Sequence, residues 1–210
     1  MQNAKKRRNL LFLTQLALLA AIEIVLAYTP LGYLRVGPLS LSFLTVPVAI
    51  GACVLGPTAG AVLGGVFGIT SYINAITGGS VMTAAMFQVN PLTCAITCIL
   101  TRVVMGYLTG WLFRLLSKAD RTDWVRYVIA SIAAPLLNTV LFMGCLVLFF
   151  YQSDYVQGMV QKLGAANPIM FIILLVGIQG AIEIVVCGVA STAVSKAVDL
   201  FLKKNSSRKK

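Results

Sequence analysis

Apolar residues dominate the chain in runs that are too long for the helices of a soluble domain. No Asp, Glu, Lys or Arg stands between Arg35 and Arg102, and further uncharged runs cover residues 127–153 and 163–182. A helix needs about 20 apolar residues to cross the hydrocarbon core of a bilayer. The first run alone is therefore long enough for about three crossings. The pattern predicts an all-α membrane protein.

Proline and glycine clusters divide these runs into six predicted transmembrane helices. Two prolines and two glycines lie within residues 29–38, Gly56-Pro57 marks a tight turn, and the sequence TGGS follows at residues 77–80. Pro91 is expected to kink a long fourth helix. The chain is interpreted as a single membrane domain, residues 1–210, with helices expected at residues 10–28, 39–55, 58–76, 84–116, 124–151 and 168–202.

Composition supports a membrane environment. Hydrophobic residues make up 59% of the chain and charged residues only 11%, and the mean hydropathy is +0.90. A soluble domain needs roughly twice that share of charge, because its surface faces water. Too few charged side chains are present to cover a globule.

The positions of the basic residues predict the orientation in the membrane. Of the 17 Lys and Arg residues, four lie in residues 5–8, four in residues 114–126 and six from residue 196 onward. Short loops rich in Lys and Arg stay on the cytoplasmic side. Both termini are therefore expected in the cytoplasm of a multi-pass protein of the cell membrane. This grouping also argues against nucleic acid as the reason for the net charge of +11.

The residue types that most enzymes and metal sites need are missing from the sequence. The chain contains no histidine, so a Ser-His-Asp or Cys-His relay and a histidine-ligated metal are impossible. It also lacks the GxxxxGK[ST] sequence of a P-loop. The five cysteines lie in apolar segments and are interpreted as packing residues. We expect no enzyme, no cofactor and no metal.

Polar residues inside the predicted helices are the candidates for a binding site. A charge at the bilayer centre costs roughly 2.5–3.5 kcal/mol on insertion scales, so it is usually kept for a function. Gln179 and Glu183 share one face of the sixth helix, and Gln88 is expected on the face of Arg102. The candidate substrate-binding residues, which could meet a small polar molecule entering from outside, are Arg35, Tyr72, Asn74, Gln88, Asn90, Arg102, Asn138, Gln179 and Glu183.

Structural roles for the same residues remain open. Arg102 and Glu183 could neutralise each other as a buried pair, and intramembrane Asn and Gln often act as hydrogen bonds between helices. Glu23 near the outer end of the first helix is expected to be structural, with Arg35 as its partner. Glycines at positions 56, 60, 64 and 68 form a stripe that is expected to let another helix approach closely.

The chain resembles the substrate-binding S components of energy-coupling factor (ECF) vitamin transporters. Ala17 and Ala21 form an AxxxA pattern in the first helix, as in that family, and residues 41–71 are also similar to it, with the sequence LSFLTVPVAIGACVLGPTAGAVLGGVFGITS. The six-helix length fits as well. Within the family, the sequence TPLGYLRVGPLSLSFLTVPVAIGA is most similar to the pantothenate-type branch.

The resemblance implies a binding subunit and not an enzyme. Such a subunit captures a vitamin at the outer face beneath a lid formed by the first outer loop. It docks through Ala17 and Ala21 onto an ECF module, which consists of a transmembrane coupling subunit and two ATPases. Pantothenate carries a carboxylate, an amide and hydroxyls, which suit Arg102 or Arg35 together with the Asn and Gln residues.

Three other interpretations stay open from the sequence. The chain could be an S component for another vitamin or precursor, such as riboflavin or hydroxymethylpyrimidine. It could also be a stand-alone secondary transporter, for which Glu183 with Arg102 is the only plausible proton relay. A third class, a structural membrane protein, would use the polar residues for helix packing alone.

Overall fold

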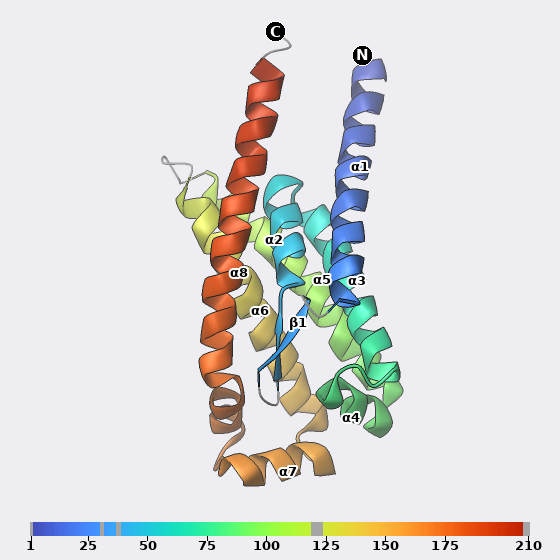
Figure 1. Ribbon diagram of the computed structural model, residues 1–210, viewed down its shortest axis with the longest axis vertical. Coiled ribbons are helices and arrows are strands. Elements are labelled where there is room, and N and C mark those ends of the chain that lie inside the picture. The colour runs from blue at the N-terminus through green and yellow to red at the C-terminus, as the bar shows by residue number, and fades with distance from the viewer. Residues whose placement is uncertain (1, 30–31, 37–38, 119–123, 208–210) are drawn as a thin grey trace.

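The computed structural model describes residues 2–29, 32–36, 39–118 and 124–207, which form a helical bundle with one small hairpin (Figure 1). In chain order the elements are α1 (Gln2–Ala27), β1 (Tyr33–Val36), β2 (Leu39–Ser42), α2 (Thr45–Val54), α3 (Pro57–Ile76), α4 (Val81–Val89), α5 (Pro91–Leu116), α6 (Val125–Phe150), α7 (Asp154–Leu163) and α8 (Pro168–Ser207).

The membrane-type helical fold predicted from the sequence is confirmed. Among the described residues, five helices are long and apolar enough to cross a membrane, or up to six if the bent pair of α7 and the first part of α8 counts as one span. Much of the apolar surface of these helices is exposed, as expected for side chains that face lipid. The helix α2 has ten residues and spans only about 15 Å at 1.5 Å per residue.

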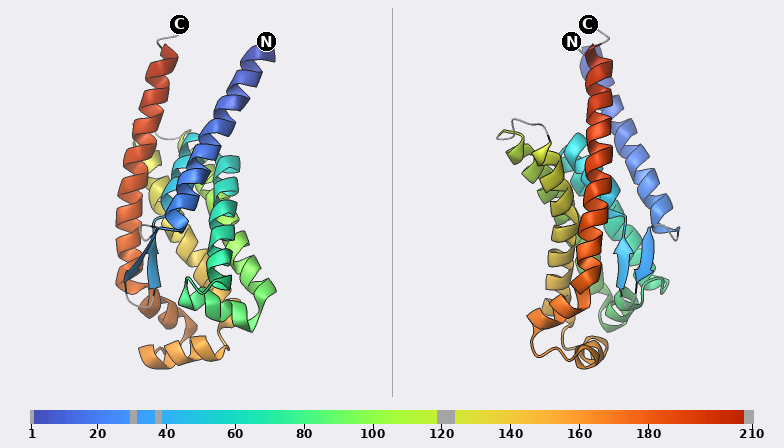
Figure 2. Two further views of the ribbon diagram at one scale, coloured as in Figure 1. Left: turned by 45° about the vertical axis from the view of Figure 1, so that its right-hand side comes forward. Right: turned by 60° about the vertical axis from the view of Figure 1, so that its left-hand side comes forward.

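Both chain termini lie at one end of the bundle, and α7 lies across the other end (Figures 1 and 2). We call these the termini end and the α7 end. Described basic residues concentrate toward the termini end: Lys6 and Arg7 lie on α1, Arg114 lies on α5 with Lys118 just after it, and Arg126 lies at the start of α6. At the α7 end the described part of the chain carries Lys162 and Asp154.

A β-hairpin replaces the first part of the second predicted helix, so the helix expected at residues 39–55 is too long. Strands β1 and β2 pair antiparallel, with Tyr33 opposite Ser42 and Val36 opposite Leu39. The sequence Leu-Ser-Leu-Ser of β2 alternates apolar and polar residues, which is the period of a strand and not of a helix. The hairpin brings Ser42 into the interior of the bundle, where its residue is 7% exposed.

The fourth predicted helix is broken rather than kinked. Helix α4 ends at Val89 and α5 begins at Pro91, with Asn90 extended between them. Pro91 has no N–H to donate to the preceding turn, so it occupies the first position of a new helix. Helix α8 is also interrupted, at Gly177, whose φ of 27° and ψ of −125° are not helical. It continues beyond the predicted end at residue 202, to Ser207.

Glycines join α3 to α5 by direct backbone contact, as the glycine stripe predicts. A Cβ atom placed on Gly60 would lie 2.3 Å from the carbonyl oxygen of Gly106, and one on Gly64 would lie 2.1 Å from that of Arg102. A Cβ atom placed on Gly68 would lie 2.6 Å from the Cα atom of Ile99. Only glycine fits at such distances, so the stripe fixes the height at which α5 presents Arg102.

Candidate functional site

Arg102 lies in the interior of the bundle, at the middle of α5, with 6% of its surface exposed. Its Nη1 atom donates to the carbonyl oxygens of Thr97 at 3.4 Å and Cys98 at 3.2 Å, and to the hydroxyl of Thr101 at 3.4 Å. The Nε atom has no hydrogen-bond partner. The guanidinium group is therefore turned back along its own helix and keeps donor capacity that this structure does not use.

Two aromatic rings hold this guanidinium group. Its central carbon lies 4.9 Å from the ring centroid of Phe67 on α3 and 4.5 Å from that of Phe142 on α6. Cation–π contacts of this kind stabilise a desolvated cation by up to about 2 kcal/mol. They compensate part of the cost of burying Arg102 without using N–H groups, so the Nε–H group stays available for an anion.

Glu183 is the acidic group that interacts with this cation through charge, and it is 8% exposed on α8. Its carboxylate interacts with the backbone N–H of Ser42 at the end of β2, and one carboxylate oxygen, Oε1, has no hydrogen-bond partner. No contact within salt-bridge distance joins this carboxylate to Arg102, and both side chains retain unpartnered atoms. The buried pair considered from the sequence is a charge interaction across a gap, not a closed ion pair.

Asn138 is another buried polar residue with an unpartnered atom. It lies on α6, one turn after Pro135, and is 9% exposed. Its Oδ1 atom has no hydrogen-bond partner. Buried amide oxygens without a partner are uncommon, because each costs about 1–3 kcal/mol. Arg102, Glu183 and Asn138 thus all present unused hydrogen-bonding atoms inside the bundle.

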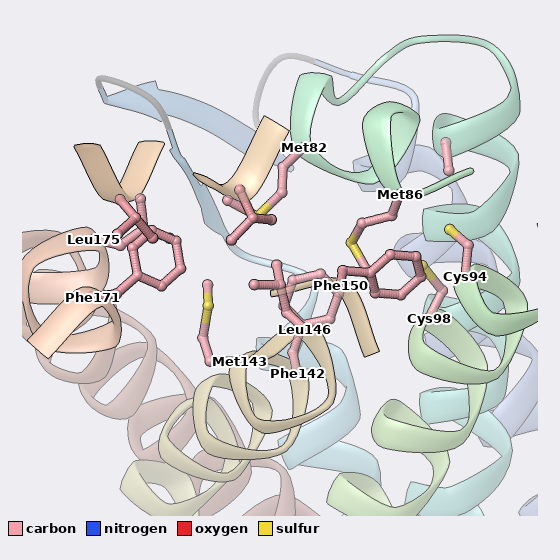
Figure 3. Packing of buried hydrophobic residues seen from close by; sticks show 13 residues of the cluster. Met82, Met86, Cys94, Cys98, Phe142, Met143, Leu146, Phe150, Phe171 and Leu175 are labelled. Carbon is pink, nitrogen blue, oxygen red and sulfur yellow. The ribbon is translucent and has the colours of Figure 1, made fainter. Parts of the chain in front are cut away.

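A cluster of apolar and sulfur-containing side chains fills the bundle between Arg102 and the α7 end (Figure 3). It draws residues from α3 to α8, and Phe142 belongs to it as well as to the Arg102 contacts. Sulfur atoms of methionine and cysteine adapt to irregular shapes, so they suit a surface that repacks around a ligand. The labelled members are Met82, Met86, Cys94, Cys98, Phe142, Met143, Leu146, Phe150, Phe171 and Leu175.

Tyr72 and Asn74, the candidates on α3, lie near the α7 end. Tyr72 is half-buried against this cluster, and its ring meets that of Phe87 edge to face at 5.9 Å between centroids. Asn74 is half-buried beside the backbone of Gly79 in the turn that follows α3. Tyr72 therefore borders the apolar cluster, and Asn74 borders a turn.

The break between α4 and α5 separates two other candidates from Arg102. Gln88 is exposed near the end of α4, so it does not share a helix face with Arg102 as the continuous helix implied. Asn90 is exposed and its Oδ1 atom accepts a hydrogen bond from the backbone N–H of Thr93 at 3.1 Å. This bond caps the first turn of α5, which gives Asn90 a structural role.

Two candidates lie outside the described side chains. Arg35 stands in β1 and Gln179 in α8, and their backbones belong to these elements. Their proposed contacts with a substrate stay predictions. The same holds for the expected pairing of Arg35 with Glu23, whose own side chain is fully buried with both carboxylate oxygens unpartnered.

Ala17 and Ala21 are exposed on α1, the helix that packs most loosely on the rest of the bundle. Residues of α1 contact mainly α3 and α2. The exposed side also carries large apolar residues, among them Leu18 and Val25. A face with small residues at i and i+4 and apolar neighbours suits close contact with another transmembrane helix.

Phe67 and Ser42 are among the residues of the interior site that are missing from the set predicted from the sequence. Phe67 directly precedes Gly68 of the glycine stripe, and this position in the sequence is a signal that it lies near the α3 face that packs on α5. Ser42 falls within a predicted helix, and only its place at the end of an alternating strand could have indicated its contact with Glu183.

A protein-family model described as "ECF transporter, substrate-specific component" matches residues 11–195. The match covers the AxxxA pattern, the hairpin, the glycine stripe and the interior polar residues. No curated protein is similar enough to match the chain.

Proposed function

Because the chain belongs to the family of ECF transporter substrate-specific components, we propose that it is the binding subunit of an ATP-driven vitamin uptake transporter and that its substrate is pantothenate. The single observation that carries the substrate class is the guanidinium group of Arg102, which is buried, held by two aromatic rings and left with an unused N–H. Such a group favours a small carboxylate, which it can bind through two parallel hydrogen bonds.

The neighbouring polar atoms support a ligand with more than a carboxylate. The unpartnered amide oxygen of Asn138 could accept from an amide N–H or a hydroxyl, and Glu183 could accept from a hydroxyl. Pantothenate offers a carboxylate, an amide and two hydroxyls. Its apolar methyl groups would lie against the cluster next to Phe142. Tyr72 borders the same cluster. Arg35, Asn74 and Gln179 remain proposed contacts, and Gln88 and Asn90 would become contacts only if α4 turned inward.

The orientation follows from charge in this proposal. The described basic side chains gather toward the termini end, which we assign to the cytoplasm by the positive-inside rule. The α7 end then faces outward, and substrate enters there. The hairpin of β1 and β2, which ends at Ser42 against Glu183, would serve as the lid over the bound molecule.

The proposed partners are a transmembrane coupling subunit and two ATPases. The chain has no P-loop sequence with which to bind ATP, so the energy must come from other subunits. We assign the docking face to α1, where Ala17 and Ala21 are exposed. An exposed small-residue pair lets a partner helix approach to close distance in lipid.

The deciding experiment is a melting-temperature series of the purified protein across a panel of vitamins, followed by radiolabelled pantothenate binding. A ligand at 100 times its dissociation constant stabilises the folded state by about 2.7 kcal/mol. We expect a shift with pantothenate and none with riboflavin or hydroxymethylpyrimidine. A shift with one of these instead would end the pantothenate assignment. Uptake by the chain alone in vesicles, without ATPases, would favour a secondary transporter.

A further inference from the structure

One face of α8 carries a row of polar residues that leads away from Glu183, the member of the row that belongs to the proposed substrate site. Glu183, Cys187, Ser191 and Ser195 follow each other at every fourth position and are therefore stacked along the helix. All are buried, with Ser191 1% and Ser195 0% exposed. The hydroxyl oxygens of both serines have no hydrogen-bond partner, so neither bonds back to the carbonyl one turn earlier.

Helix α6 faces this row with polar groups at matching heights. A Cβ atom on Gly188 would lie 3.1 Å from Ile132, and the hydroxyl of Tyr127 meets the carboxylate of Asp199. The two helices are thus antiparallel, and this register places Ser131 near Ser191 and Asn138 near Glu183.

The same part of α6 has two further unused groups. The hydroxyl of Ser131 is fully buried without a partner. Its carbonyl group lacks the donor that a helix normally supplies, because the residue four positions later is Pro135, which has no N–H. Proline inside a membrane helix is tolerated where water or a neighbouring side chain meets the freed carbonyl.

Helix α2 closes the third side of the row. The side chain of Thr45 interacts with Cys187, and the hydroxyl of Ser195 interacts weakly with the Cys53 thiol without a hydrogen bond of full geometry. Helix α2 therefore runs parallel to α8 along the row. The carbonyl oxygen of Ser42 accepts a hydrogen bond from Cys187 Sγ at 3.7 Å. We call this set of facing residues of α2, α6 and α8 the α8 seam.

The ends of the α8 seam differ in character. One end is Glu183. Arg102 of α5, the backbone of Ser42 in β2 and Cys187 on its own helix interact with this carboxyl group. Helices α2 and α6 contribute Thr45 and Asn138, whose side chains do not titrate. The other end, near the termini end, is the half-buried Asp199, with Tyr127 and Arg126 of α6 beside it. Asp199 continues the row by one turn beyond Ser195 and is only half-buried, so the row reaches the surface at this end.

We propose that the α8 seam holds a file of water molecules that connects the carboxyl group of Glu183 with the solution at the termini end. Each buried unpartnered hydroxyl costs about 1–3 kcal/mol, and a buried water that makes two to four hydrogen bonds removes this cost. The serines, the freed carbonyl of Ser131 and the amide of Asn138 supply such bonds at intervals of one helical turn, about 6 Å. One or two water molecules bridge each interval.

The file gives Glu183 a route for proton exchange that bypasses the α7 end. A proton moves along hydrogen-bonded water by transfer between neighbouring molecules, so no net reaction or co-reactant is needed. On this inference the protonation of Glu183 follows the solution at the termini end even while the α7 end is closed by its apolar cluster. The inference does not depend on which vitamin is bound.

Radiolytic footprinting of the full-length protein tests the file. Hydroxyl radicals formed by X-rays from bound water oxidise the side chains next to it, even when these are buried. We expect Cys187 and Cys53, which border the α8 seam, to be oxidised in the native protein. In S191A/S195A, which loses two water partners with little change in volume, oxidation of both cysteines should fall several-fold. Protection of both cysteines in the native protein would overturn the proposal.

A matched control and a second measurement complete the test. T109V removes a buried hydroxyl that already donates to Met105 at 2.8 Å, and it should leave oxidation of Cys187 and Cys53 unchanged. Equal protection in T109V and S191A/S195A would show that the fall does not depend on the seam hydroxyls and would count against the file. If S191A/S195A does not fold, the single variants S191A and S195A are compared, each with an expected smaller fall. Unchanged oxidation in both would overturn the proposal.

Discussion

The guanidinium carbon of Arg102 lies 4.5 Å from the ring centroid of Phe142, so the one charged residue in the middle of α5 rests on an aromatic face instead of a carboxylate. A carboxylate at that place would neutralise the cation and leave nothing for an anionic ligand. An aromatic ring lowers the free-energy cost of burying the guanidinium group and leaves its Nε–H group without a partner. This arrangement is the physical basis for assigning an anionic substrate.

Substitutions of Arg102 distinguish the contribution of its charge to binding from that of its two parallel hydrogen bonds. We expect Arg102→Ala to abolish measurable pantothenate binding, since losing one partner of a buried charge contact costs about 2–5 kcal/mol. Arg102→Lys should retain part of the affinity, because it keeps the charge but loses the bidentate contact. Radiolabelled binding measures both. The exposed Arg114→Ala is the matched control, and unaltered binding by R102A at native melting temperature would contradict the site.

The long helices are predictable from the sequence because their apolar runs exceed what any soluble element needs. The helix expected at residues 124–151 corresponds to α6 at Val125–Phe150, and the third predicted helix agrees with α3 as closely. The hairpin is not predictable in the same way, because Leu39 to Ser42 adjoin the apolar start of α2 and periodicity over four residues is a weak signal. Asn90-Pro91 does carry a cap signal, but a proline within a long apolar run is equally typical of a kink.

The candidate site is predictable only in part. The cost of burying Arg102 and Glu183 identifies them from the sequence alone, since a membrane tolerates such residues only for a reason. Their surroundings depend on which helices are neighbours, which a single sequence does not fix. Gln88 shows the consequence, because its expected face rests on a continuous helix, whereas α4 ends at Val89.

The contact between α3 and α5 predicts that alanine destabilises the protein at a glycine inside the contact but not at a glycine beside it. Gly106→Ala should destabilise the protein by about 1–3 kcal/mol, because a Cβ atom would lie 2.0 Å from the carbonyl oxygen of Gly60 and the helices must separate. Gly65→Ala is the control on α3, where the nearest atom is a methyl of Val103 at 3.6 Å. Thermal unfolding in detergent measures both. Equal melting temperatures would show that the two helices are not in backbone contact.

Enlarging the small residues on α1 should affect assembly and leave substrate binding intact. Ala17→Leu combined with Ala21→Leu places two bulky side chains on an exposed face, which blocks close approach of a partner helix. We expect co-purification with the coupling subunit and ATP-dependent uptake to be lost while vitamin binding is unchanged. Leu148→Phe, an enlargement at an exposed position of α6, is the control. A complex of native yield with the double variant would remove α1 as the docking face.

Asn90 distinguishes a helix cap from a substrate contact. Its Oδ1 atom accepts from the N–H of Thr93 at the start of α5, and Ala at such a position costs about 0.5–2 kcal/mol of stability. Asn90→Asp and Asn90→Ser retain an oxygen for the cap but lack the amide that a substrate hydrogen bond would use. A cap role therefore predicts that only N90A has a lower melting temperature. It also predicts that all three variants bind the vitamin with native affinity at temperatures where they are folded. Loss of affinity in the folded Asp and Ser variants would instead place Asn90 in the binding site, and would require α4 to turn inward when the ligand binds.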